Sequence, residues 1–219
     1  MIPILRIGIE KMLEILMHTV LQNLVFQKKH IWTALFFILT YRLGESQLGK
    51  IAPLFVLGSP DKGGLGLSTT TVGGIYGTLG VIALLLGGIV AGIMVSHKGL
   101  KYWILPMALA INVPDILYVI LAWMKCSDLW MIGCFVAIEQ FGYGFGFTAY
   151  MMYMMYFSEG AYKTSHYSIC TAFMALSMMI PGFIAGSLEL AVGYSTFFWI
   201  ANACSITTFI ITYFVYKKL

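Results

Sequence analysis

One long apolar stretch of this sequence is interrupted by side chains that could bind a solute or carry a proton. Positions 32–57 contain Arg42, Glu45, Gln47 and Lys50. Positions 42, 45, 46, 49 and 50 share one face of an α-helix, and Phe, Leu and Ile fill the other side. Arginine and lysine can bind anionic groups, and a partly desolvated carboxylate beside a cation can change its protonation state. We expect this polar face to contact protein or a water-filled cavity.

A second apolar stretch, at positions 129–157, contains Glu139, Gln140 and Tyr143. Tyr143 follows Glu139 by about one helical turn, so both side chains can reach the same cavity. The two cations of the first stretch balance its glutamate and Glu139, so we expect these four charges to lie near one another. Two readings stay open: an ion-pair cluster that only joins the two stretches, or a site for substrate or protons.

Residue patterns of enzymes and metal sites are missing. The sequence has no G-x-S-x-G, H-E-x-x-H or P-loop motif, and its histidines show no ligand spacing. The cysteines form no C-x-x-C pair and are expected to pack as small apolar residues. The sequence therefore predicts neither an enzyme nor a metal or cofactor site.

Composition defines the setting of these residues. Of 219 residues, 60% are hydrophobic and only 10% are charged, against about 25% charge in a typical soluble domain. The chain cannot cover a water-exposed globule with polar surface, which excludes a soluble enzyme, a nucleic-acid binder and a disordered chain. A polytopic membrane protein remains, and its required partner is the lipid bilayer.

The predicted fold is all-α. Positions 1–31 form an amphipathic helix with a polar stripe, expected to lie in the membrane interface. Positions 32–219 form a bundle of six transmembrane helices, since each span needs about 20 apolar residues. The predicted spans are 32–57, 72–95, 102–124, 129–157, 166–190 and 196–216.

Small and breaking residues predict local features of these spans. The Gly73-xxx-Gly77 and Gly88-xxx-Gly92 spacings predict close helix packing. Kinks are expected at the four prolines inside spans, Pro53, Pro106, Pro114 and Pro181. Asp115 is expected to cap a break in its helix, and residues Ser68 to Thr71 to cap the second span.

The distribution of lysine and arginine predicts the orientation. With the N-terminus inside, the cations at 6, 11, 28, 29, 98, 101, 163, 217 and 218 are cytoplasmic, and only those at 62 and 125 are external. Positive charge favours the cytoplasmic side. Both termini are therefore expected in the cytoplasm, and the net charge of +4 requires no nucleic-acid partner.

The predicted cytoplasmic loop between the second and third spans carries a motif. Residues 92–101 read GIMVSHKGLK, which resembles the major facilitator signature G-x-x-x-D-[RK]-x-G-[RK]-[RK]. Ser96 stands in place of the acid and Leu100 in place of one base. The signature lies between the second and third helices of each six-helix half, as here, and is often degenerate in the second half. The resemblance implies a C-terminal half of a 12-helix major facilitator.

Further stretches resemble the AmpG-type muropeptide permeases and their bacterial relatives, from about position 32 to the end. They are YRLGESQL at 41–48, LSTTTVG at 67–73, EQFGYG at 139–144, YKTSHY at 162–167 and GYSTFF at 193–198. In this family the first and fourth helices of each half line the central cavity. These correspond to the two stretches that carry the intramembrane charges, and the amphipathic start resembles the linker between halves.

The resemblance implies a secondary transporter of the inner membrane, with proton-coupled uptake of muropeptides or a related polar solute by alternating access. Its partner would be a missing N-terminal half or a second copy of the chain. Arg42 and Lys50 are expected to bind anionic groups, Glu45 and Glu139 to couple protons, and Gln47, Gln140 and Tyr143 to supply further contacts. Gly92, Lys98, Gly99 and Lys101 are expected in a gating loop.

Two alternatives remain open at this point. A major facilitator for another cargo, such as a drug, a sugar or a siderophore, would have the same fold. A non-transporting membrane scaffold or truncated product would bury the same polar stripe in a structural ion-pair network.

Overall fold

A computed structural model describes residues 28–125, 128–160 and 162–219, which form helices and no strand. The predicted amphipathic helix at 1–31 lies almost entirely outside the described residues. The helices are α2 (Ile31–Thr40), α3 (Leu43–Leu57), η2 (Pro60–Lys62), α4 (Thr69–Gly74), η3 (Ile75–Gly80), α5 (Val81–Asn112), η4 (Val113–Asp115), α6 (Ile116–Met124), α7 (Leu129–Ser158), α8 (Lys163–Val192) and α9 (Tyr194–Tyr216). The all-α expectation therefore holds for the described chain.

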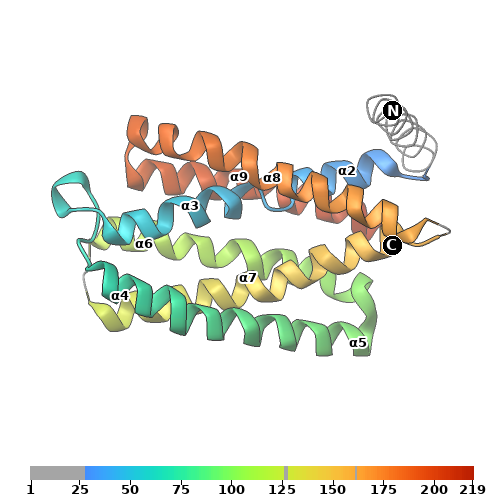
Figure 1. The fold of residues 1–219 in the computed structure, drawn as a ribbon, viewed down its shortest axis with the longest axis horizontal. Helices are drawn as coiled ribbons and strands as arrows, with labels where there is room; N and C mark the ends of the chain where they lie inside the picture. The colour runs from blue at the N-terminus through green and yellow to red at the C-terminus, as the bar shows by residue number, and fades with distance from the viewer. Residues whose placement is uncertain (1–27, 126–127, 161) are drawn as a thin grey trace, which may run out of the picture.

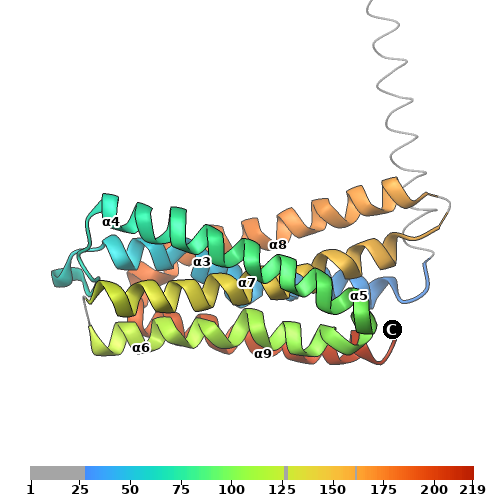
Figure 2. The same cartoon turned by 90° about the horizontal axis from the view of Figure 1, so that it is seen from below.

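The helices lie side by side along the long axis of the molecule (Figures 1 and 2). Turns connect successive passes through the bundle, so consecutive passes run in opposite directions (Figure 1). α2 and α3 together make one pass, and the chain from α4 to the middle of α5 makes the next (Figure 1). α7 packs closely on α5, while α8 and α9 pack on α2 and α3.

Three of these helical stretches are long and apolar enough to cross a membrane: Thr69–Met124, Lys163–Val192 and Tyr194–Tyr216. The first contains two of the predicted spans, because it reverses direction within α5. The two stretches with the intramembrane charges, 32–57 and 129–157, are not among the three. The described chain is thus a helical membrane protein, and the total of six spans stays a prediction.

The first predicted span is interrupted where no proline stands. α2 ends at Thr40, Tyr41 and Arg42 form a turn, and α3 begins at Leu43. Backbone groups freed by a break inside a membrane need other partners. Thr208 of α9 provides one, since its Oγ1 donates to the carbonyl oxygens of Tyr41 at 3.0 Å and Thr40 at 3.3 Å.

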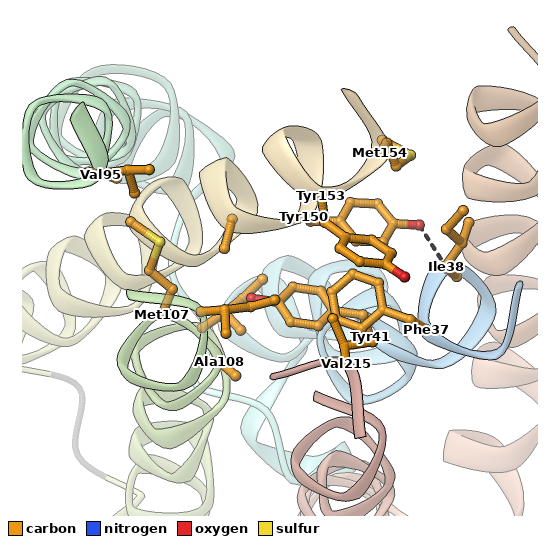
Figure 3. Close-up of a cluster of buried hydrophobic side chains, with 14 of the residues drawn as sticks. Phe37, Ile38, Tyr41, Val95, Met107, Ala108, Tyr150, Tyr153, Met154 and Val215 are labelled. Carbon is orange, nitrogen blue, oxygen red and sulfur yellow. Dashed lines mark hydrogen bonds between the residues drawn. The ribbon is translucent and has the colours of Figure 1, made fainter. Parts of the chain in front are cut away.

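Two tyrosines hold this break against α7. Tyr150 donates from its hydroxyl to the Ile38 carbonyl at 2.6 Å, as Figure 3 shows. Tyr41 donates to the Gly146 carbonyl at 2.9 Å. The two rings stack with centroids 5.3 Å apart and an interplanar angle of 6°. The expected contact between the first and fourth predicted spans is therefore built by aromatic rings and backbone carbonyls.

Of the four prolines with predicted kinks, only Pro114 coincides with an interruption, the short helix η4. Pro53, Pro106 and Pro181 lie within continuous helical segments, and kinks there stay predictions. Helices in a bundle can accommodate proline when neighbouring groups satisfy the freed carbonyl. The expected cap before the second span is confirmed, because the Ser68 hydroxyl accepts from the Thr71 backbone N–H.

Glycine makes the reversal within α5. Gly99 has φ 76° and ψ 163°, a conformation essentially restricted to glycine. It separates the two antiparallel arms of α5. Gly193, between α8 and α9, adopts nearly the same angles, φ 76° and ψ 162°. Two hairpin turns of the bundle therefore depend on the same backbone state.

Glycine also sets the approach of α5 to α7. A Cβ at Gly87 would overlap the Phe141 carbonyl, and one at Gly144 would overlap the Leu84 carbonyl. Gly142 and Gly146 face the second arm of α5 in the same way. Gly73, Gly77 and Gly92 lack the predicted close packing within the described part of the chain, because a Cβ at any of them meets none of its atoms within 4 Å. Spacing alone does not say which glycines face a neighbour.

Contacts between chain segments bring many of the described cations to one end of the bundle. The Lys28 ammonium donates to the Phe157 and Glu159 carbonyls at the end of α7. Lys218 donates to the Thr33 hydroxyl, and the Lys101 ammonium lies 5.7 Å from the Tyr216 ring centroid. Lys62 belongs to the loop after α3, at the other end of the bundle (Figure 1). This asymmetry agrees with the predicted charge distribution between the two ends.

Candidate functional site

Arg42 is the centre of the polar group on α3. Its side chain is only 2% exposed. Nε donates to Glu45 Oε2 at 2.8 Å, and Nη2 donates to the Tyr143 hydroxyl at 2.7 Å. The guanidinium carbon lies 4.8 Å from the Phe147 ring centroid. Arginine tolerates such a site because its planar group can form hydrogen bonds at its edge and stack on rings.

The break between α2 and α3 explains why Arg42 points to α7. Arg42 precedes the first residue of α3 with φ −109° and ψ 16°, so its side chain leaves the helical path. Glu45 lies within the first turn of α3 and pairs with Arg42 from there. The sequence periodicity placed these residues on one helix face, whereas in the structure the ion pair lies at a helix start.

Glu139 lies in a separate polar group between helices. Its Oε2 accepts from Gln140 Nε2 at 2.9 Å and from the Tyr118 hydroxyl of α6 at 3.4 Å. Tyr118 in turn shares a hydrogen bond of 2.9 Å with the Tyr76 hydroxyl of η3. Glu139 is buried, and its hydrogen-bond partners in the described chain are neutral donors, with no cation among them. The group can hold a carboxyl in either protonation state.

The predicted four-charge cluster does not assemble. Lys50 is exposed and turns toward α8, where its side chain lies near Gly182. It borders an open hollow of about 830 Å³ whose other lining residues are largely apolar, including Met178, Met179 and Phe183. No ion pair or hydrogen bond engages its ammonium among the residues that the structure describes. The balance of two cations and two carboxylates therefore did not predict which of these side chains lie in contact.

Of the other three predicted site residues, two join the polar groups and one does not. Tyr143 joins the Arg42 group, and Gln140 joins the Glu139 group, as described above. Gln47 is buried but donates to the Leu43 carbonyl of its own helix at 3.0 Å, so it belongs to neither group. Tyr118 and Tyr76 were not predicted. The signal available for Tyr118 was its position one turn after Asp115 in an otherwise apolar span.

Asp115 was predicted to cap a helix break, and that prediction is wrong. The residue does stand at the break, as the residue before α6, but its side chain forms no capping hydrogen bond. It is 1% exposed, and neither carboxyl oxygen has a hydrogen-bond partner among the described residues. A helix cap therefore does not account for this buried acid.

The loop motif lies at the reversal within α5. Lys98 is exposed, with its ammonium 4.6 Å from the Tyr102 ring centroid, and Lys101 lies over Tyr216. Gly99 supplies the turn itself. Gly92 is two helical turns earlier, inside the first arm, where an added Cβ would meet no described atom within 4 Å. Only the second part of the motif therefore forms the connection between the arms.

These features define an all-helical membrane protein with buried polar groups between its helices, and the comparisons with known proteins point to transporters. No protein-family model matches the chain. It is 22% identical over 190 residues to "Putative transporter AmpG 1" of Rickettsia prowazekii, covering 87% of this chain and 41% of that protein. It is 23% identical over 181 residues to the "Anhydromuropeptide permease" of Escherichia coli, covering 83% of this chain and 36% of that protein.

The same similarity extends to an "Uncharacterized protein" of Haemophilus influenzae, at 22% identity over 80% of this chain and 42% of that protein. The chain thus spans about two fifths of the length of the curated relatives it matches. The resemblance to AmpG-type permeases, read from short motifs, is confirmed at this distant level of identity. Two of these relatives are named a transporter and a permease, which are not enzymes.

Proposed function

We propose that this chain is the C-terminal six-helix half of a major facilitator transporter that takes up muropeptides, or a related polar solute, together with protons. The similarity to an anhydromuropeptide permease over about two fifths of that protein's length supports both the cargo and the half. A polar cavity between two halves would then alternate its access between the two sides of the membrane.

The observation that carries this proposal is the buried Glu139. An ionisable residue inside a membrane protein is expensive, and it is a functional hypothesis by default. Glu139 is held by Gln140 and Tyr118, which leaves its carboxyl free to bind or release a proton. Glu45, by contrast, is paired with Arg42. We therefore assign proton coupling first to Glu139, and to Glu45 only if the Arg42 pair opens.

The two cations of α3 and its start also differ in how available they are, since Arg42 is paired and Lys50 is not paired within the described part of the chain. Lys50 is exposed beside the open hollow at α8, so it is the better candidate for an anionic group of the cargo. Arg42 could bind such a group only by exchanging Glu45 for it. The turn at Gly99, with Lys98 and Lys101, would serve as a gating loop on the cytoplasmic side. Both termini would then lie in the cytoplasm and the chain in the inner membrane.

One experiment tests three parts of the proposal: the muropeptide cargo, the coupling to protons and the need for a second half. The chain is inserted into vesicles alone and joined to the protein segment encoded immediately upstream, and proton-driven uptake of labelled anhydromuropeptide is measured. Uptake is expected only in the joined form, because a lone half leaves part of its polar surface without a partner. If correctly inserted joined protein takes up no muropeptide, the cargo assignment fails.

In the joined form, Glu139→Gln is expected to abolish the response of uptake to a proton gradient while leaving insertion intact. Glutamine keeps the shape and hydrogen bonds of the side chain but cannot exchange a proton. Glu159→Gln, in the exposed turn after α7, is the matched control and should transport like the parent. Proton-driven uptake that survives Glu139→Gln would remove Glu139 from the mechanism.

A non-transporting scaffold is the second candidate, and the closed Arg42 pair favours it. A structural ion pair needs only its mutual contact, so exchanging the charges in an Arg42→Glu, Glu45→Arg double variant should change stability alone. In a transporter, the same exchange is expected to change uptake as well. A transporter for another cargo would be recognised by competition of that cargo with labelled muropeptide.

A further inference from the structure

The break between α5 and α6 carries two buried polar side chains, three residues apart, inside the apolar bundle. Asn112 ends α5, and the short helix η4 carries the chain through Pro114 to Asp115. In such a 3₁₀ turn, residues three apart stand directly above one another. Asn112 and Asp115 are 2% and 1% exposed, so both side chains lie away from solvent and lipid.

Three oxygen atoms of this pair have no hydrogen-bond partner among the described residues: both carboxyl oxygens of Asp115 and Oδ1 of Asn112. The Asn112 amide is oriented by its own Nδ2, which donates to the Ala108 carbonyl at 2.8 Å. Its Oδ1 therefore remains as an acceptor. An ionised carboxylate is also only an acceptor, so an ionised Asp115 would leave all three oxygens unsatisfied.

A single proton removes the conflict. Protonated Asp115 has one O–H donor, and Asn112 Oδ1, three residues earlier at the same break, is a buried acceptor that lacks one. A buried polar atom without a partner costs about 1–3 kcal/mol, and a buried unpaired charge costs more. Binding a proton neutralises the charge and satisfies two of the three oxygens at once.

Among the described residues, two acids on neighbouring helices act on Asp115: Glu139 of α7, and Glu45 of α3, which is paired with Arg42. The hydroxyls of Tyr118 on α6 and Tyr76 on η3 belong to the Glu139 group. Pro114 lies against α7 at Gly142, one turn from Glu139, which places the break beside the Glu139 group. Carboxyls on neighbouring helices can interact through their charges.

We propose that Asp115 and Asn112 form a second proton-binding site, linked electrostatically to Glu139. The Asp115 carboxylate takes up one proton on an oxygen lone pair and donates that O–H to Asn112 Oδ1; release returns the proton and restores the charge. The proposal extends the proposed function, because it gives a proton-coupled transporter two interacting carboxyls. Loss of a proton from one acid would then make loss from the other less favourable.

Infrared difference spectroscopy of the membrane-inserted chain tests the site without transport. A carboxylic acid has a C=O stretch that a carboxylate and an amide lack. The parent should show a protonated carboxyl at neutral pH that is absent in Asp115→Asn. In Asn112→Ala the band should persist but shift, since the acceptor of the O–H is lost. An unchanged spectrum in Asp115→Asn would overturn the proposal, as would an unshifted Asp115 band in Asn112→Ala.

Glu139→Gln tests the linkage between the two acids. Removing a neighbouring negative charge makes ionisation of Asp115 easier, so its band should disappear at a lower pH than in the parent. An unchanged titration would refute the linkage. Failure of Glu139→Gln to alter proton-driven uptake, with the Asp115 band behaving as expected, would instead remove Glu139 from the transport mechanism and leave the Asp115 site standing.

Discussion

A guanidinium inside an apolar bundle needs partners for its donors, and Arg42 obtains them from three helices. Glu45 supplies a charge from α3, Tyr143 supplies a hydroxyl and a ring face from α7, and the Met178 sulfur of α8 accepts from Nη1 at 3.2 Å. The Tyr143 hydroxyl is the oxygen acceptor among the contacts that cross between helices. Because a hydrogen bond to a charged group is stronger than a neutral one, Tyr143 is expected to stabilise the α3–α7 contact.

Tyr143→Phe tests this contact. The ring remains for the cation–π contact, but one N–H of a buried guanidinium loses its acceptor, at a cost of about 1–3 kcal/mol. Unfolding of the purified protein in detergent or nanodiscs measures the change. Tyr156→Phe is the matched control on the same helix, since that side chain is 50% exposed. Equal stability of the two variants would contradict the role assigned to the Tyr143 hydroxyl.

At the scale of elements, the packing of the bundle depends on two features. One is the set of hydrogen bonds at the break between α2 and α3, and the other is the close packing of α5 on α7. The break at Tyr41 and Arg42 sets the direction of the Arg42 side chain, and α9 stabilises it through Thr208. The α5–α7 contact brings the Glu139 group against the neighbouring helices. Each feature has an adjacent position that serves as its control.

Thr208→Val removes the hydroxyl that donates to the carbonyls of Tyr41 and Thr40, while keeping the side-chain volume. Hydrogen bonds between membrane helices contribute about 0.6 kcal/mol on average, and up to about 1.7, so a loss within that range is expected in an unfolding experiment. Thr207→Val should have a smaller effect, because the exposed Thr207 hydroxyl donates only to Cys204 of its own helix. The reverse order would mean that Thr208 does not support the break.

Gly87→Ala is expected to lower stability by about 1–3 kcal/mol, because the new methyl group would push α5 from the Phe141 carbonyl of α7. Gly92→Ala, in the same helix, meets open space and should leave stability unchanged or raise it by up to about 1 kcal/mol. Thermal unfolding in detergent compares the two. A cost at Gly92 similar to that at Gly87 would show that helix facing does not govern these positions.

For the whole molecule, the uneven distribution of cations is the feature with the widest consequence. The contacts of Lys28, Lys101 and Lys218 bring three chain segments to one end. In a membrane the more basic end favours the cytoplasm. The fold therefore agrees with the charge pattern in separating a more basic end from the other, and the cytoplasmic orientation of that end stays a prediction.

Single cysteines at positions 98 and 62 test that orientation in a background without native cysteines. A membrane-impermeant thiol reagent applied outside whole cells should label Lys62→Cys and leave Lys98→Cys unlabelled until the cells are opened. The lysines replaced are exposed, so neither substitution is expected to disturb the bundle. Labelling of position 98 from outside would reverse the predicted topology.

The sequence alone determined the class of protein, the approximate limits of most helices and the family resemblance. Composition and long apolar runs can be read from the sequence without knowing the fold. Few classes of protein other than a helical membrane protein can contain so many apolar residues in such long runs. It also identified Arg42, Glu45, Glu139, Gln140 and Tyr143 as exceptional, because charged and polar residues in apolar runs require an explanation wherever they point.

Only the tertiary structure decided which of these residues meet. A helical period places Arg42 and Lys50 on one face, but a break at Tyr41 and Arg42 turns the first toward α7, while Lys50 faces α8. The break is made by distant partners such as Thr208 and Tyr150, so no local signal predicts it. The lack of a hydrogen-bond partner for Asp115 among the described residues is also a property of the packed bundle. It depends on where every surrounding helix places its donors.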